Sequence, residues 1–254
     1  MTKFFRVMCC VLAGVLMISA ANVARAQEAT FTEAQKAELQ TMMKDFLMNN
    51  GQTIIESVQK HQEQMMADAN KEADDKIAAR LPELTAKDLP STGNPNGDVT
   101  VVEFFDYRCG YCHKAANDLV ELLKTETNTR FVFLDLPVLG PASLEAAKWS
   151  KAAHKQGKFF EYHLALMQNN GDSSEQNFME IGKTLGLDVE KLKADAGSAD
   201  VMKSIDRSRE LASELAFNGT PGFIINGKPY RGYIGLEGMK QAIAEARSAG
   251  AKTP

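Results

Sequence analysis

The sequence predicts an α/β fold in which a small sheet carries a long helical insertion and follows an N-terminal helical extension. An apolar strand runs directly into an amphipathic helix, and a second apolar strand follows, at 101–105, 109–127 and 129–136. Strand, helix and strand form a right-handed crossover with a parallel strand pair. The chain is then helical over 142–216, with breaks at glycines and at 169–172. A hairpin and a closing helix end it, at 223–225, 230–233 and 236–248, with the turn at Asn226-Gly227.

The composition is that of an ordinary globular protein. Of 254 residues, 44% are hydrophobic and 24% charged, and the formal net charge is −4. Neither a basic surface nor a strongly acidic one follows from these values, so nothing favours a nucleic-acid partner.

Residues 1–26 have the pattern of a signal peptide. Lys3 and Arg6 precede an apolar run over 7–21, and Ala24-Arg25-Ala26 supplies a small-X-small end. The alternative is an uncleaved anchor, but the apolar run is shorter than the roughly 20 residues that a membrane span needs. We expect export to a periplasm-like compartment, with cleavage after about Ala26.

Residues 27–81 predict two helices, separated near Asn49-Asn50-Gly51, which we call the stalk. One apolar stripe continues through both helices, at Leu39, Met42, Met43, Phe46, Leu47, Ile54, Ile55, Val58 and Met65. A narrow stripe on an otherwise polar helix favours association with copies of the same chain. Packing on the chain's own domain and binding to a partner or a surface are the alternatives.

The segment 82–97 predicts a linker. It holds Pro82, Pro90 and Pro95 together with three turn pairs, at 92–93, 94–95 and 96–97. The main domain is expected over 98–254, with its helical insertion at about 141–217.

The cysteines indicate redox chemistry. Cleavage of the signal peptide discards Cys9 and Cys10 and leaves Cys109 and Cys112. A disulfide across so short a loop restrains the unfolded chain little, so it is a poor structural staple. At the start of a helix, Cys109 is favoured as the thiolate that attacks a disulfide, and Cys112 is placed to resolve the mixed disulfide. No dissociable cofactor is required, because the redox group is the Cys109–Cys112 disulfide itself.

Two further residues are candidates for a functional role in addition to the dithiol. Glu103 lies in an apolar strand, where a charged carboxylate is costly, so a raised pKa and a proton-relay role are expected. An exposed position on that strand is the alternative for Glu103. Pro221 lies at the entry of an apolar strand and lacks an N–H; an ordinary trans turn proline is the alternative to a cis one.

Together, the strand, Cys-Gly-Tyr-Cys, the helical insertion and the Gly219-Thr220-Pro221 hairpin resemble the DsbA-type branch of the thioredoxin superfamily, over about 88–250. The resemblance implies a thioredoxin fold, a cis Pro221 against the dithiol, and a Thr220 backbone that pairs with an extended client. It also implies that Glu103 moves protons to and from Cys112.

Gly110-Tyr111 and Thr220 are similar to the residues of DsbC-type isomerases, and the helical stalk is similar to that of ScsC-type proteins. These likenesses imply a disulfide isomerase or reductase that acts on unfolded or misfolded exported proteins. They also imply a membrane redox partner and a homo-oligomer formed through 27–81. The alternative is a monomeric DsbA-type dithiol oxidase.

Two alternative functions, c-type haem attachment and copper binding, would use the same cysteines. With His113, the sequence also satisfies the Cys-X-X-Cys-His pattern of c-type haem attachment, although a role for His113 in tuning the thiolate is the simpler reading. Two thiolates also suit Cu(I). His61, His154 and His163 are scattered without a carboxylate cluster, so we expect no other metal site.

Overall fold

The computed structural model describes residues 31–169 and 172–250. The predicted signal peptide, 1–26, lies outside these residues. The chain forms two compact units that divide between Gln64 and Met65, and each is described by itself. Among the described residues no helix is both long and apolar enough to cross a membrane.

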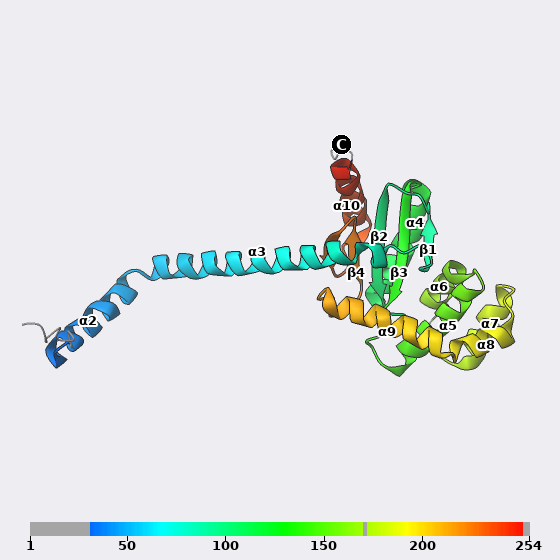
Figure 1. The fold of residues 1–254 in the computed structure, drawn as a ribbon, viewed down its shortest axis with the longest axis horizontal. Coiled ribbons are helices and arrows are strands. Elements are labelled where there is room, and N and C mark those ends of the chain that lie inside the picture. The colour runs from blue at the N-terminus through cyan, green and yellow to red at the C-terminus, as the bar shows by residue number, and fades with distance from the viewer. Residues whose placement is uncertain (1–30, 170–171, 251–254) are drawn as a thin grey trace, which may run out of the picture. The chain divides into compact units, whose positions relative to one another are not determined.

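The first unit is helical. Helix α2 spans Glu33–Asn49, and α3, Gly51–Leu84, begins in this unit and ends in the second (Figure 1). Thr32 caps α2, because its hydroxyl accepts from the Gln35 N–H while the Gln35 side chain accepts from the Thr32 N–H. Helix α2 has no buried residue, so its apolar stripe lies open to solvent.

The second unit is built on a five-stranded sheet with the order β1-β3-β2-β4-β5. The strands are β1 (Ser91–Gly93), β2 (Val99–Phe105), β3 (Thr129–Asp135), β4 (Gly222–Ile225) and β5 (Lys228–Arg231). The central pair β2–β3 is parallel, and the other pairs are antiparallel. Helix α4 (Gly110–Thr125) makes the crossover between β2 and β3, as the sequence predicted.

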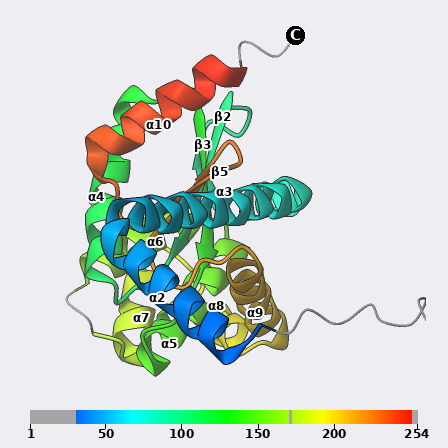
Figure 2. The ribbon, with the colours of Figure 1, turned by 90° about the vertical axis from the view of Figure 1, so that its left-hand side faces the viewer.

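The insertion consists of five helices between β3 and β4, which are α5 (Pro141–Lys155), α6 (Phe159–Gln168), α7 (Glu175–Thr184), α8 (Val189–Ala196) and α9 (Ala199–Glu214). The closing helix, α10 (Gly235–Gly250), packs beside α4 (Figure 2). This is the thioredoxin fold with a helical insertion and an N-terminal helical extension.

Successive side chains of β2 point to opposite faces of the sheet and therefore pack in two hydrophobic cores. Val99, Val101 and Phe105 join the larger core with residues of α4, α5, α6 and α10. Val102 and Phe104 join the smaller core, which also contains Ile77 and Leu84 of α3 and Leu211 and Leu215 at the end of α9.

The predicted linker, 82–97, differs from what the structure shows. Pro82 lies inside α3, and residues 91–93 form β1, which pairs with β3 through Ser91 and Val132. The end of α3 is part of the second unit because Ile77 and Leu84 are fully buried there. The division between the units therefore lies within α3 and not in the proline-rich segment.

Candidate active site

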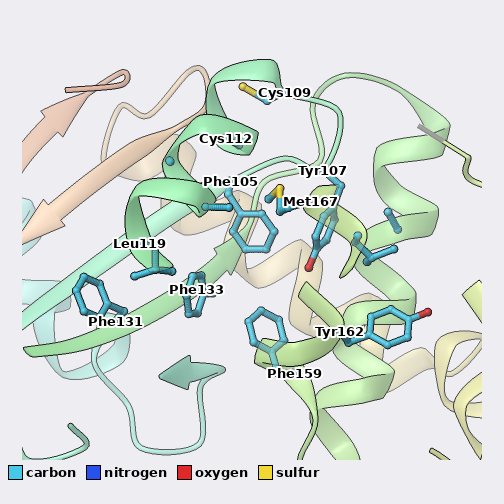
Figure 3. Packing of buried hydrophobic residues seen from close by; sticks show 14 of the residues in the cluster. Phe105, Tyr107, Cys109, Cys112, Leu119, Phe131, Phe133, Phe159, Tyr162 and Met167 are labelled. Carbon is cyan, nitrogen blue, oxygen red and sulfur yellow. The ribbon is translucent and has the colours of Figure 1, made fainter. Parts of the chain in front are cut away.

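The first cysteine lies where the polar bend after β2 becomes helix α4. Cys109 is the N-cap residue of α4, with extended backbone angles, and its carbonyl accepts from the N–H groups of Cys112 and His113. Both cysteines are free thiols, and their exposed fractions are 8% for Cys109 and 0% for Cys112. Figure 3 shows Cys109 at the start of the helix with Cys112 one turn further in.

The loop before β4 contacts this sulfur directly. The Thr220–Pro221 peptide bond is cis, as the resemblance implied. The Cys109 thiol donates to the Thr220 carbonyl oxygen, with 3.2 Å between Sγ and O. Pro221 is buried and Thr220 is half-buried, so the structure brings the predicted nucleophile and the predicted client-pairing residue together.

Glu103 lies beneath the second cysteine. Its side chain is on the same side of β2 as Val101 and Phe105 and is buried, and Oε1 has no hydrogen-bond partner among the described residues. Burial raises the pKa of the Glu103 carboxyl to about 8. Burial, and then the nearby Glu103 charge, raise the pKa of the Cys112 thiol well above its ordinary value. A base is therefore needed if Cys112 is to act as a thiolate, and Glu103 is placed to be that base.

Asp106, which the sequence analysis did not single out, holds the two loops around the dithiol together. Its Oδ1 accepts from the Arg108 N–H at 2.7 Å, and its Oδ2 accepts from Val138 and Leu139 at 2.9 and 3.0 Å. The bond from the Arg108 N–H to the Asp106 side chain forms an Asx turn. An Asp at the end of a strand is a local sequence signal for such a turn. The second loop comes from beyond β3, and no local pattern predicts that contact.

His113 and Tyr107 connect the active-site helix with the insertion. His113 donates from Nε2 to the Tyr107 carbonyl oxygen at 2.7 Å, since a carbonyl only accepts. The Tyr107 hydroxyl and His163 Nδ1 of α6 are 3.1 Å apart. His163 is buried among aromatic rings, and burial lowers its pKa to about 3. This histidine packs in the core and stays neutral.

The remaining predicted residues form the exposed rim. Gly110 and Tyr111 are exposed, Tyr111 to 58%, and the Tyr111 ring lies 5.7 Å from the Tyr233 ring between centroids. Val138 and Leu139 are each 48% exposed. These exposed apolar side chains, Tyr111 beside Cys109 in the sequence and Val138 and Leu139 on the loop bound by Asp106, are available to an incoming polypeptide.

Comparison with known proteins identifies the family. The thioredoxin family model Thioredoxin_4 matches residues 85–245. A solved thioredoxin-like oxidoreductase from Silicibacter pomeroyi DSS-3 is 38% identical, covers 66% of this chain and 97% of its own, and superposes with a TM-score of 0.62. The thiol-disulfide exchange protein α-DsbA2 from Wolbachia pipientis is 28% identical, covering 70% and 97%, with a TM-score of 0.65. The chain belongs to the thioredoxin family, in the DsbA-type branch of thiol–disulfide oxidoreductases.

Other matches bear on the extension and on the length. A Proteus mirabilis ScsC mutant, 19% identical with a TM-score of 0.64, covers 88% of this chain and 100% of its own, and so shares the fold. A Salinispora arenicola Na⁺/H⁺ antiporter is 32% identical over 156 residues, 61% of this chain and 24% of its own. The chain thus spans about a quarter of that relative. A probable disulfide bond formation protein D from Bacillus cereus is 27% identical over 166 residues, 60% of this chain and 76% of its own.

Proposed function

We propose that this protein is an extracytoplasmic disulfide isomerase or reductase that acts on misfolded exported proteins through Cys109 and Cys112. The observation that carries the proposal is the difference between the two sulfurs. Cys109 touches the carbonyl of Thr220 at the rim, whereas Cys112 is fully buried above a carboxyl with a raised pKa.

The reaction begins when the Cys109 thiolate attacks one sulfur of a client disulfide. A Cys109–client bond forms, the client S–S bond breaks, and the other client sulfur leaves as a thiolate. The client backbone lies along Thr220 and Pro221 as an added strand. If a client thiolate then attacks the mixed disulfide, the bond is reshuffled and no electrons are transferred overall.

The second route is reduction. Cys112 transfers its proton to the Glu103 carboxylate, attacks Cys109 Sγ and releases the client thiolate. Two electrons pass to the client, and the enzyme is left with a Cys109–Cys112 disulfide, which a membrane dithiol partner must reduce. Run in reverse, the same steps oxidise a client dithiol, so the redox partner decides the direction.

Self-association through the stalk completes the proposal. Five apolar side chains of α2 are at least 36% exposed and recur at helical spacing, at Leu39, Met42, Met43, Phe46 and Leu47. Exposure of so much apolar surface on one helix favours burial against another copy. An oligomer would present several dithiols to one client and shield them from an oxidase.

Of the rival roles, oxidation is the one that an observation favours, because the Bacillus cereus relative is described as a probable disulfide bond formation protein. The haem reading loses support, since the His113 Nε2 that would bind iron already donates to Tyr107.

The test is the refolding of a scrambled disulfide-bonded protein, with the mass of the oligomer measured by light scattering. Phe46→Lys places a charge on the apolar stripe, and the matched control Thr41→Lys places the same charge on the opposite side of α2. We expect unscrambling by the wild type and by Thr41→Lys, and monomers that only oxidise or reduce for Phe46→Lys. A wild-type monomer that oxidises dithiols and does not unscramble would identify a DsbA-type oxidase instead.

A further inference from the structure

A pocket adjoins the loop that contacts the reactive sulfur. It is an open pocket with a volume of about 280 Å³, lined by residues 216–221 together with Arg231 and Gly232. One of its walls is Thr220, whose carbonyl accepts from the Cys109 thiol. A client backbone lying along Thr220 and Pro221 would therefore run past the opening of this pocket.

The pocket has a fixed positive charge in its wall. Arg231 Nε donates to the Ala216 carbonyl at 3.3 Å, and one terminal nitrogen, Nη2, donates to the Leu215 carbonyl at 3.4 Å. The guanidinium also lies over the Phe217 ring, 5.3 Å from its centroid. Two of its five donors are used in this way, and three remain. These contacts hold the guanidinium in one place without neutralising it.

Arg231 makes no ion pair with a carboxylate in the part of the chain that the structure describes. By contrast, Lys228, three residues earlier on the same strand, lies 3.6 Å from Glu245. Arg231 is exposed, so its charge faces the solvent-filled pocket and a carboxylate from outside could reach it.

The sheet register places Arg231 beside the strand that follows the loop in contact with the reacting cysteine, and its guanidinium lies over Phe217 of the smaller core. Arg231 pairs with Gly222, which is two residues beyond Thr220. Extended chain rises about 3.3 Å per residue, so roughly 7 Å separates these positions along the strand. Gly232, whose N–H donates to the Pro221 carbonyl at 3.0 Å, turns the chain away at φ +97° and leaves the pocket open. One or two client residues span that distance.

We propose that this pocket is a specificity site that binds the carboxylate of a client Asp or Glu lying one or two residues from the cysteine in the mixed disulfide. Guanidinium and carboxylate pair through two parallel hydrogen bonds, and the planar Arg231 is already oriented for them. The inference rests on the proposed function, because it requires a client that pairs with Thr220. It adds that clients with acidic residues beside their cysteines react faster.

A purely structural role for Arg231 predicts something different. Its two bonds go to carbonyls at the C-terminal end of α9, where a cation is also stabilising. If that were its whole role, replacing it would lower stability and slow every client equally. Charge preference among clients is therefore the readout that separates the two roles.

The experiment measures how fast the reduced protein attacks peptides that carry one cysteine activated as a mixed disulfide with an aromatic thiol. Sets of three peptides place Glu, Gln or Lys at each position from two before to two after the cysteine. In at least one position we expect the Glu peptide to react roughly 3- to 20-fold faster than the Lys peptide at low salt. The ratio should shrink at high salt, because ions screen the exposed pair.

Substitutions assign this preference to one residue. Arg231→Met should reduce the Glu-to-Lys ratio to about one, Arg231→Glu should reverse it, and Arg231→Lys should retain part of it. Lys228→Met removes the same charge from the same strand and should leave the ratio unchanged. A thermal melt of each variant measures the stability that Arg231 contributes at the end of α9.

Each remaining outcome decides the question. If Arg231→Met slows all three peptides equally, the residue is structural and the inference is wrong. If the wild type reacts equally with all peptides, the specificity site is refuted and the proposed function stands. If the wild type attacks no peptide, the proposed function and this inference both fail.

Discussion

Two sulfurs one helical turn apart occupy opposite environments in this protein. Cys109 donates to the Thr220 carbonyl, the exposed Tyr111 follows it in α4, and Asp106, three residues before it, binds the loop with the exposed Val138 and Leu139. Around Cys112 are the core and the buried carboxyl of Glu103, whose Oε1 has no hydrogen-bond partner in the described part of the chain. The same chemical group therefore receives different roles from its surroundings, since the partly accessible sulfur at the helix start can attack a client and the fully buried one can only attack its neighbour.

The largest expected effect comes from removing either sulfur. Cys109→Ser should lower the rate of disulfide exchange by roughly 10³-fold or more, because the other thiol in the described part of the chain, Cys112, is fully buried. Cys112→Ser should keep the first attack and accumulate mixed disulfides, since nothing resolves them. Non-reducing electrophoresis with a client protein measures both. If the two variants behaved equally, the assignment of Cys109 as the attacking thiol and Cys112 as the resolving thiol would be wrong.

Glu103→Gln tests the resolving step by the buried Cys112 separately from the first attack by Cys109. The amide keeps the shape of the side chain but accepts no proton, so resolution by Cys112 should slow roughly 10- to 100-fold. Attack by Cys109 should change little. In the wild type, the rate of resolution should rise with pH around a midpoint near 8, where the Glu103 carboxyl ionises, and this inflection should be missing from the variant. Stopped-flow fluorescence of a preformed mixed disulfide follows the step. An unchanged pH profile would remove Glu103 from the mechanism.

His163→Gln tests whether the buried His163 makes the free energy of unfolding depend on pH in the acid range. The pKa of His163 is about 3 in the folded chain and 6.5 by default, so between these values the unfolded chain binds more protons. Stability is therefore lost as the pH falls from about 6.5 towards 3. Between pH 7 and pH 4 the wild type should lose about 2 to 3 kcal/mol more than the variant. Urea denaturation at both pH values measures the difference. Equal losses would indicate that His163 is protonated within the fold.

The smallest effect is expected at Tyr111, which is 58% exposed and whose ring lies near Tyr233 and Lys114. Tyr111→Ser should change the free energy of unfolding by less than about 0.5 kcal/mol, as exposed substitutions usually do. Exchange with an unfolded client should slow a few-fold, while exchange with a small disulfide such as oxidised glutathione should not. A similar slowing with both would place Tyr111 in the chemistry and not in client contact.

Elements that depend on a few neighbouring residues, such as the hairpin turn, could be predicted from the sequence. Asn226 and Gly227 form the hairpin turn with positive φ values of 44° and 90°, the conformation for which this pair is preferred. The second hairpin strand begins at Lys228, two residues earlier than predicted, and includes Pro229 opposite Ile224. A proline discourages prediction of a strand, but this strand is at the edge of the sheet, where a missing N–H is tolerated.

Contacts between distant segments were not predictable from one sequence. Strand β1 has only the residues Ser91, Thr92 and Gly93 and no apolar alternation, so its pairing with β3 is visible only in the fold. The same holds for Asp106 and the loop at Val138, and for Tyr107 and His163, whose partners are at least 32 residues away. The sequence predicts that the two sulfurs lie at the start of a helix. The residues that pack around them are brought together only by tertiary contacts.

The end of α3 determines where this protein can be recombined with others. Arg130 of β3 donates to the carbonyls of Thr85 and Ala86 at 2.7 and 2.8 Å, and Glu83 pairs with Arg207 of α9. With Ile77 and Leu84 buried, the last turns of the helix are inseparable from the sheet. A chimaera that exchanges the N-terminal extension should therefore be spliced upstream of Ile77. Within a helix, a foreign segment needs only to keep the phase of 3.6 residues per turn to present its own oligomer-forming face. The single helix α3 thus allows the N-terminal segment of this chain to be exchanged while the dithiol and its surroundings stay the same.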